Sequence, residues 1–192
     1  MNIVFLGNCI FTSKIIDSLL NNKNLAITLV SYKDCPDYCV NRSLPRFRKH
    51  NNFKYIDFDI NKDNELAIVA KGKYDLLLCC CWDRKLPEEL LNLLPCFNFH
   101  ASLLPKYRGA TPLQAQLKNG EKFGGATIHL MTQNFDSGPI YKQSSFKISK
   151  REDLESIALK VSKRMCLLAK QFFDEYPEIE LRPQNESEAT FC

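Results

Sequence analysis

Residues 74–81 read Tyr-Asp-Leu-Leu-Leu-Cys-Cys-Cys, and this almost wholly apolar run decides the fold class. A strand inside a parallel sheet is covered on both faces, so it is apolar along its whole length rather than at alternate positions. The run is also far shorter than the roughly 20 residues that a membrane-spanning helix needs. We therefore expect residues 74–81 to form a central strand of a parallel sheet.

Short strands and helices alternate on both sides of this run. Strands are expected at Asn2–Leu6, Leu25–Ser31, Phe53–Ile60 and Cys96–His100. Helices are expected at Glu65–Lys71, at Glu88–Leu94 and around the apolar face of Ile15, Ile16, Leu19 and Leu20. This alternation predicts an α/β fold with a doubly wound, mainly parallel sheet.

The second half of the chain has a different pattern. It predicts a helix from Thr111 to Asn119, strands at Gly125–Met131 and Ile140–Ile148, a capping box at Ser149-x-x-Glu152, and a long helix ended by Pro177. The apolar stripe of that helix comprises Leu154, Ile157, Val161, Met165, Leu168 and Phe172. We expect one domain over residues 1–178, followed by a polar tail or edge segment over 179–192.

Composition and charge exclude several classes of protein. The 192 residues are 45% hydrophobic, which rules out a disordered chain, a collagen-like fibre or a coiled coil. A net charge of +4 permits an anionic ligand without calling for nucleic acid. Met1 is followed at once by an apolar strand pattern, so we expect no signal peptide, no membrane segment and a cytoplasmic location.

The nine cysteines do not follow the spacing of a disulfide framework. Cys79, Cys80 and Cys81 are consecutive, so two at most can face one side of a strand. Cys35 and Cys39 form a pair without a second pair at zinc-finger distance. We therefore expect reduced thiols that pack as small apolar groups, and no bound metal.

Residues 32–51 form the one long irregular stretch before the middle of the chain, and they are rich in basic side chains. The simpler explanation is a solvated face. The alternative is a phosphate-binding surface, because Arg42, Arg46 and Arg48 offer bidentate donors.

Asn98 and His100 stand at the end of the predicted strand Cys96–His100. Strand geometry sends both side chains to the same face, and an amide beside an imidazole can stabilise a developing oxyanion. Asp136, in a turn before Ser137-Gly138-Pro139, could orient and charge the imidazole. Taken alone, a structural histidine that caps a strand end is the simpler explanation of the pair.

The surrounding string is more specific. Asn98-Phe99-His100-Ala101-Ser102-Leu103-Leu104-Pro105-Lys106-Tyr107-Arg108-Gly109 precedes Thr111-Pro112, and later come Gly125–Met131 and Asp136–Ile140. This pattern resembles the formyltransferases that take a formyl group from 10-formyltetrahydrofolate, and the resemblance runs from Met1 to about Tyr176. The family includes glycinamide ribonucleotide, methionyl-tRNA and amino-sugar formyltransferases, which have a Rossmann-like fold.

The resemblance implies a role for each matched residue. Asn98, His100 and Asp136 match the catalytic triad of the family. Asn98 and protonated His100 would hold the oxygen of the formyl group as it gains negative charge. Asp136 would orient His100, keep it cationic and help to move the proton of the amine. His129 is open to two interpretations, a supporting role in the site or a buried structural role.

The resemblance also places the folate donor beside two loops, Cys81–Leu86 and Thr132–Phe135, whose backbone groups would bind the pterin. The candidate donor-binding residues are Cys81, Trp82, Asp83, Arg84, Leu86, Met131, Thr132 and Phe135. Arg84 or Lys85 could also pair with the glutamate tail of the folate. For Asp83 a solvated turn is the simpler explanation.

The acceptor is open. The continuation Lys106-Tyr107-Arg108-Gly109 is closer to the tRNA and amino-sugar branches, and the chain leaves no room for the extra domain of methionyl-tRNA enzymes. We therefore favour a small amine on a nucleotide-linked sugar, whose phosphates one or two of Arg42, Arg46, Arg48 and Arg108 would contact. A methionyl-tRNA-type enzyme, a glycinamide ribonucleotide enzyme and an inactive folate-binding protein are the alternatives. The sequence leaves the oligomeric state open, a homodimer included.

Overall fold

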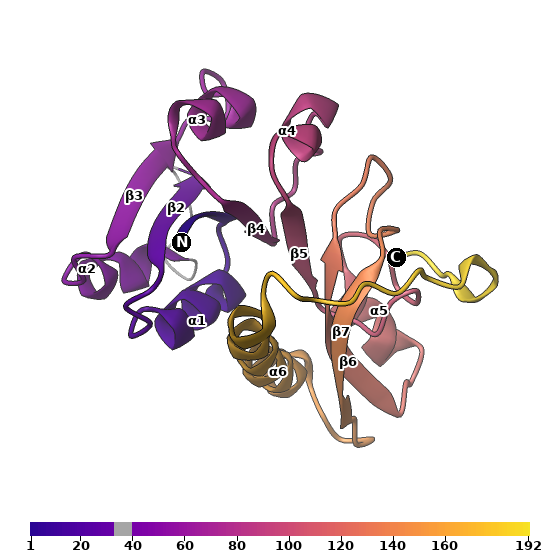
Figure 1. Ribbon diagram of the computed structural model, residues 1–192. Helices are drawn as coiled ribbons and strands as arrows, with labels where there is room; N and C mark the ends of the chain where they lie inside the picture. Colours follow the sequence, from indigo (N-terminus) through magenta and orange to yellow (C-terminus); the bar gives the residue numbers. More distant parts are fainter. Residues whose placement is uncertain (33–39) are drawn as a thin grey trace. The chain divides into compact units, whose positions relative to one another are not determined.

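The computed structural model describes residues 1–32 and 40–192 (Figure 1). The chain divides into two compact units, Met1–Phe97 and Asn98–Cys192. The pair Cys35 and Cys39, considered above as zinc ligands, lies outside the described residues. Within those residues, every helix is too short or too polar to cross a bilayer.

The first unit contains a parallel sheet built from four strands. These are β1 (Asn2–Gly7), β2 (Ala26–Tyr32), β3 (Phe53–Phe58) and β4 (Leu76–Cys80). They lie in the order β3-β2-β1-β4, and each neighbouring pair is parallel. All five residues of β4 are buried, which confirms that residues 74–81 contain a central strand.

The order of these strands makes the first unit doubly wound. The chain moves outward from β1 to β3 and then returns to place β4 on the other side of β1. Because such crossovers are right-handed, α1 (Ile10–Leu19) and α2 (Leu44–Phe47) cover one face, and α3 (Glu65–Lys71) and α4 (Glu88–Leu93) cover the other (Figure 1). The strand order reverses between β1 and β4, where open α/β sheets bind ligands.

The stretch predicted to be irregular contains helical turns after Tyr32. A 3₁₀ turn spans Val40–Ser43, and α2 follows it directly. Val40, Leu44 and Phe47 are buried, because their spacing of four and three residues puts them on one helical face. Residues 40–47 are therefore helical rather than irregular and bury three apolar side chains, whereas Arg42, Arg46 and Arg48 are exposed, as a solvated face requires.

The second unit is built around β5 (Cys96–His100), β6 (Phe123–Leu130) and β7 (Ile140–Lys147), in that order. β5 leads into this unit from the first, and β6 and β7 are antiparallel. The helices are α5 (Pro112–Lys118) and α6 (Leu154–Glu175), and α6 packs against β6 and β7. Both predicted strands and both predicted helices of this half are therefore present.

The start of α6 differs from the prediction. Asp153 is the N-cap, and its side chain accepts a hydrogen bond from the backbone N–H of Ser156 at 2.9 Å. Leu154 is 40% exposed, whereas Ile157 and the rest of the predicted stripe are buried. Glu152 does accept the N–H of Ser149, which is the return bond of the predicted capping box, but this pair lies in the turn before the helix, and Ser149 is not the N-cap.

Residues 179–192 are held by backbone pairing. Arg182 and Ile140 exchange two backbone hydrogen bonds of 2.7 and 2.8 Å, as in an antiparallel bridge. Further along, Phe191 forms a parallel bridge with Arg108. The backbone of this segment is thus paired at two points, with β7 at Ile140 and with Arg108 after β5.

Candidate active site

Asn98 and His100 project from β5 as the strand periodicity predicts. His100 is 5% exposed and Asn98 is half-buried. The Nε2 atom of His100 donates to the backbone carbonyl of Tyr107 at 2.7 Å, since a carbonyl can only accept. This contact fixes the ring, so that Nδ1 faces Asp136.

Asp136 lies in the turn between β6 and β7 and has a φ of +52°, an uncommon conformation for a non-glycine residue. The backbone N–H of Gly109 donates to its Oδ2 at 2.9 Å. Gly138 is required beside it, because a Cβ there would lie 1.8 Å from the carbonyl oxygen of Leu130. The Asp-Ser-Gly sequence therefore sets a tight turn that presents the carboxylate.

The structure brings the three predicted catalytic side chains together within the second unit. The Nδ2 atom of Asn98 donates to Oδ1 of Asp136 at 3.2 Å. The Nδ1 atom of His100 lies 3.5 Å from Oδ2 of the same carboxylate. An amide, an imidazole and a carboxylate thus meet at the end of one strand.

His129 is a fourth member of this cluster. It projects from β6 and is 2% exposed. Its Nε2 atom lies 3.3 Å from Oδ1 of Asp136 and 3.3 Å from Nδ2 of Asn98. Its Nδ1 atom donates to the carbonyl of Leu130 at 3.0 Å. His129 is therefore both buried and in contact with the site. This geometry is compatible with each of the two interpretations, a supporting role in the site and a buried structural role.

The charges of the cluster follow from burial and from these contacts. Burial by itself would raise the pKa of Asp136, but the hydrogen bond with His129 and the charge of His100 outweigh it and hold that pKa well below its ordinary value. Burial lowers the pKa of His100, although Asp136 and the carbonyl of Tyr107 act in the opposite direction. Asp136 is thus ionised, whereas the predicted cationic state of His100 is opposed by its burial.

A residue that the sequence did not single out supports the turn of Asp136. The side-chain amide of Gln184 donates to the backbone carbonyls of Asp136 and Gly138, both at 2.7 Å. Its oxygen accepts two hydrogen bonds from Arg108, at 2.8 and 3.2 Å. Gln184 lies 48 positions beyond Asp136, and no local pattern could have revealed this contact.

Arg108 has a different role from the one expected. Its side chain is 3% exposed, and it binds both carboxylate oxygens of Glu186, at 2.7 and 2.8 Å. Together with the bonds to Gln184, these contacts occupy all three guanidinium nitrogens. The expectation that Arg108 is available for acceptor phosphates is corrected: it anchors the C-terminal segment.

The other arginines named above lie in the first unit. Arg46 forms an ion pair with Asp17, and Arg48 lies over the ring of Tyr55 at 5.4 Å. Arg42 is exposed at the end of the 3₁₀ turn. All three arginines are exposed.

The loop after β4 holds most of the candidate donor-binding residues, and Trp82 is tied to its own unit. Its ring stacks on Tyr32 with centroids 4.7 Å apart, and meets Phe58 edge-on at 5.2 Å. Its Nε1 atom donates to Glu65 at 3.1 Å. The side chain of Trp82 therefore rests on an aromatic cluster.

Arg84, Asp83, Leu86 and Cys81 complete this loop. The Nε atom of Arg84 donates to the buried Glu65 at 2.7 Å, so the expected pairing with a folate tail competes with an existing ion pair. Asp83 accepts a hydrogen bond from the hydroxyl of Tyr32. Leu86 is 2% exposed, and Cys81 is exposed with a φ of +55°.

The remaining candidates for donor binding lie in the second unit. Phe135 is 61% exposed, a large fraction for a phenylalanine, and Met131 is half-buried. The hydroxyl of Thr132 donates to the carbonyl of Asn134 at 3.1 Å, which shapes the turn before Asp136.

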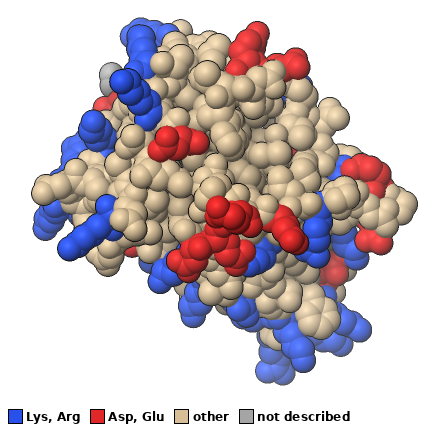
Figure 2. All heavy atoms as spheres, in the orientation of Figure 1, with Lys and Arg blue, Asp and Glu red and all other residues tan. Residues whose placement is uncertain are grey.

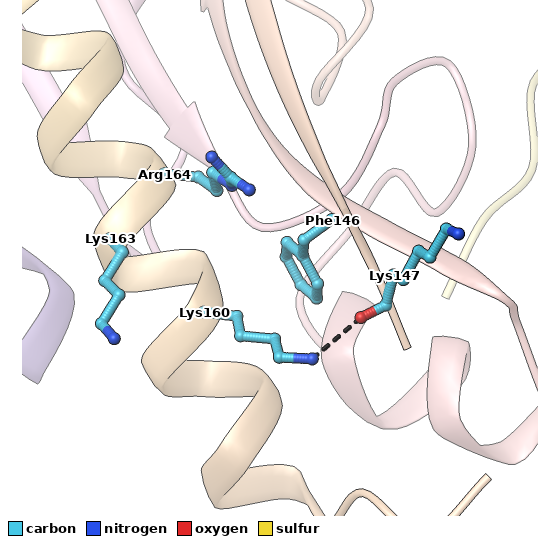
Figure 3. A pocket seen from close by; sticks show the side chains of 5 residues that line it. All are labelled: Phe146, Lys147, Lys160, Lys163 and Arg164. Atoms are coloured by element: carbon cyan, nitrogen blue, oxygen red, sulfur yellow. Dashed lines mark hydrogen bonds between the residues drawn. The ribbon is translucent and has the colours of Figure 1, made fainter. Parts of the chain in front are cut away.

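A basic cavity of about 410 Å³ lies between β7 and α6. Its lining comprises Phe146, Lys147, Lys160, Lys163 and Arg164 (Figure 3). Lys160 reaches from α6 to the carbonyl of Lys147 at 2.9 Å and also pairs with Glu152. Lys and Arg side chains gather at the lower edge of the view in Figure 2, below α6 and β6.

Comparison with known proteins gives the family. Residues 1–165 match the family model described as formyl transferase. The methionyl-tRNA formyltransferase of Helicobacter pylori strain P12 is 31% identical over 201 aligned positions, which cover all of this chain and 66% of that protein. The chain thus spans slightly less than two thirds of the length of this curated relative.

Solved structures share the fold. A sugar N-formyltransferase from Shewanella sp. FDAARGOS_354 superposes with a TM-score of 0.78 at 19% identity, covering all of this chain and 76% of that one. The N-formyltransferase of Helicobacter canadensis, solved with folinic acid and dTDP-3-aminofucose, gives a TM-score of 0.75 at 18% identity over 99% of this chain and 70% of that one. These matches confirm the predicted α/β fold with a mainly parallel sheet. With the family model covering most of its length, this chain belongs to the formyl transferase family.

Proposed function

We propose that this protein is an N-formyltransferase that moves the formyl group of 10-formyltetrahydrofolate to a primary amine. The observation that carries the proposal is the convergence of Asn98 and His100 on the carboxylate of Asp136. The reaction needs donors for an oxyanion and an acceptor for the proton of the amine. These three side chains offer both, and membership of the family supports the same chemistry.

The proposed step proceeds by addition and elimination at the formyl carbon. The amine nitrogen attacks this carbon, a new C–N bond forms, and the carbonyl electron pair moves to oxygen. N–H groups of Asn98 and protonated His100 stabilise the oxyanion. For this, Asn98 must turn an N–H away from Asp136 or His129, and His100 must turn one away from Tyr107 or Asp136. Asp136 accepts the proton of the amine, directly or through His100. The carbonyl then re-forms, the bond to N10 of the folate breaks, and the proton passes to N10, so that tetrahydrofolate leaves as a neutral amine.

We also propose that two segments bind the folate donor, and a separate observation supports each of them. In the loop Cys81–Leu86 we assign binding to the backbone N–H and C=O groups, because the side chains of Trp82 and Arg84 are engaged by Glu65. In the second unit, the exposed ring of Phe135 offers an apolar surface, and Met131 and Thr132 flank the same turn.

For the acceptor, we propose an aminoacyl-tRNA as the first candidate. The basic cavity between β7 and α6 supports it, because a polyanion binds where several cations are close together. Lys147 and Lys163 in this lining are exposed, and Lys150 and Arg151 are exposed on the segment that joins β7 to α6. The relative at 31% identity is named for the same acceptor.

An amino group on a nucleotide-linked sugar is the second candidate, and it is the acceptor that the sequence motif favoured. The continuation Lys106–Gly109 resembles that branch as much as the tRNA branch. Arg42 is exposed in the first unit, and its guanidinium could bind a diphosphate. With either acceptor, we propose that the protein works in the reducing environment of the cytoplasm.

The test is a formyl-transfer assay with 10-formyltetrahydrofolate and a panel of acceptors. The panel holds initiator methionyl-tRNA, several nucleotide-linked amino sugars and glycinamide ribonucleotide. We expect transfer to one of them, and a loss of roughly 100- to 1000-fold in the His100→Ala and Asn98→Ala variants. Folate binding without transfer to any acceptor would favour a binding protein, and near-native rates in both variants would refute the assigned site.

Charge reversal in the basic cavity separates the two leading acceptors. The double variant Lys163→Glu with Arg164→Glu should raise the KM for tRNA. It should leave the KM values for the folate donor and for the other acceptors unchanged. The control is Lys23→Glu, an exposed lysine of the first unit. An unchanged tRNA KM in the double variant would remove the cavity from the argument and leave the amino sugar as the better candidate.

A further inference from the structure

Three cysteine sulfurs lie close together in the first unit. Of these three residues, only Cys81 is also among those proposed for formyl transfer. The Sγ atoms of Cys9, Cys80 and Cys81 all lie within 4.8 Å of one another. Cys80 is buried, Cys9 is half-buried and Cys81 is exposed, so the cluster extends from the interior to the surface. None of the seven cysteines among the described residues forms a disulfide.

The fold explains how residues distant in sequence meet here. β1 and β4 are parallel neighbours, with Gly7 opposite Cys80, so both strands end at the same edge. Cys9 is the N-cap of α1, directly after β1. Successive strand residues point to opposite faces, but the φ of +55° at Cys81 ends the strand and turns its sulfur toward that of Cys80.

We propose that Cys9, Cys80 and Cys81 bind a thiophilic metal ion of the Zn²⁺ type through their three sulfurs. Zinc binds thiolate sulfur at about 2.3 Å, which places the sulfurs of one ion roughly 3.8–4.0 Å apart. A cluster within 4.8 Å needs only small side-chain movements to reach this separation. Three sulfur ligands would leave the fourth position of a tetrahedral ion to water or an external ligand.

A side chain beside the cluster supports its arrangement. Thr12 holds the cluster in place: its hydroxyl lies 3.7 Å from the sulfur of Cys9 and donates to the carbonyl of Cys80 at 3.1 Å. Such outer contacts orient the ligands of a metal ion.

The test is a titration of the reduced, full-length protein with Zn²⁺ in competition with a coloured chelator. We expect one ion per chain and release of protons on binding, because thiols must ionise to bind the metal. Cys9→Ser and Cys81→Ser should each weaken binding by at least about 10- to 100-fold, the loss typical of even an outer-sphere partner. Cys166→Ser, on α6 in the second unit, is the matched control and should bind as the native chain does.

Co²⁺ provides a second measurement that does not depend on affinity. Three sulfur ligands should give an intense sulfur-to-cobalt charge-transfer absorption, which Cys9→Ser and Cys81→Ser should reduce and Cys166→Ser should keep. The proposal is overturned if the native chain binds no Zn²⁺, or if both cluster variants bind it as tightly as the native chain. Because neither measurement involves formyl transfer, a negative result here leaves the proposed activity untouched.

Discussion

Asp136 is the residue on which the proposed site depends. Its two carboxylate oxygens face the backbone N–H of Gly109, the amide of Asn98 and the rings of His100 and His129. A carboxylate with this many partners stays ionised and fixed in direction. Because its folded-state pKa is lowered, Asp136 contributes stability that is present above the ordinary carboxyl pKa of about 4 and is lost as the pH falls below it.

Replacement of Asp136 by asparagine should show how the carboxylate acts on His100. The carboxylate raises the pKa of His100 against the effect of burial, so Asp136→Asn should lower that pKa further. An NMR titration of the ring protons of His100 measures the change directly. Turnover should fall while folate affinity stays within a few-fold. Identical titration curves for the two proteins would break the link between these residues.

His129 should act as a positioning residue. His129→Ala removes a contact with a charged group, which is worth about 1.5–3 kcal/mol, or roughly 10- to 100-fold in rate if it is lost in the transition state. His129→Gln retains a donor near the same place and should recover part of the rate. A purely structural role predicts instead that both variants lose stability and keep the pH profile of kcat.

The sequence was enough to predict the three residues of the proposed site, but not the residues that hold them in place. Asn98, His100 and Asp136 were found because their spacing matches a family pattern. His129 could not be resolved, since the side to which a strand residue points does not say what it touches. Gln184 had no signal, because its partners are backbone carbonyls that any sequence provides.

At the scale of elements, the long helix α6 was predicted well in its interior and poorly at its start. The apolar stripe identifies the buried face over many turns, and this signal is strong. A start signal rests on one or two side chains, and Ser149, Glu152 and Asp153 all offer a cap within five positions. Asp153 is the N-cap because its side chain accepts the N–H of Ser156, whereas the bond between Glu152 and the N–H of Ser149 closes the preceding turn.

Two cap variants test this boundary. Asp153→Ala removes the hydrogen bond to the N–H of Ser156 and should lower the free energy of unfolding by about 0.5–2 kcal/mol. Ser149→Ala should change it by no more than about 0.5 kcal/mol, as at an ordinary surface position. Urea denaturation of both variants measures the difference. The reverse order would restore the capping box that the sequence suggested.

On the scale of the whole molecule, alternation of strands and helices was enough to predict the α/β class. The parallel order β3-β2-β1-β4 follows from the reversal that a doubly wound sheet requires. The pairing of the last fourteen residues could not be predicted in this way, because they carry no periodic pattern. They are held by backbone bridges and by the contacts of Arg108 and Gln184, which depend on the fold being complete.

Deletion of residues 179–192 should therefore lower the stability of the second unit. It removes Gln184 and Glu186, which bind the guanidinium of Arg108, together with the backbone bridges at Arg182 and Phe191. The truncated chain should unfold at a lower urea concentration and lose activity, because the turn of Asp136 also loses Gln184. If truncation alone leaves both stability and turnover unchanged, these residues are dispensable, and the domain ends near residue 178 as the sequence suggested.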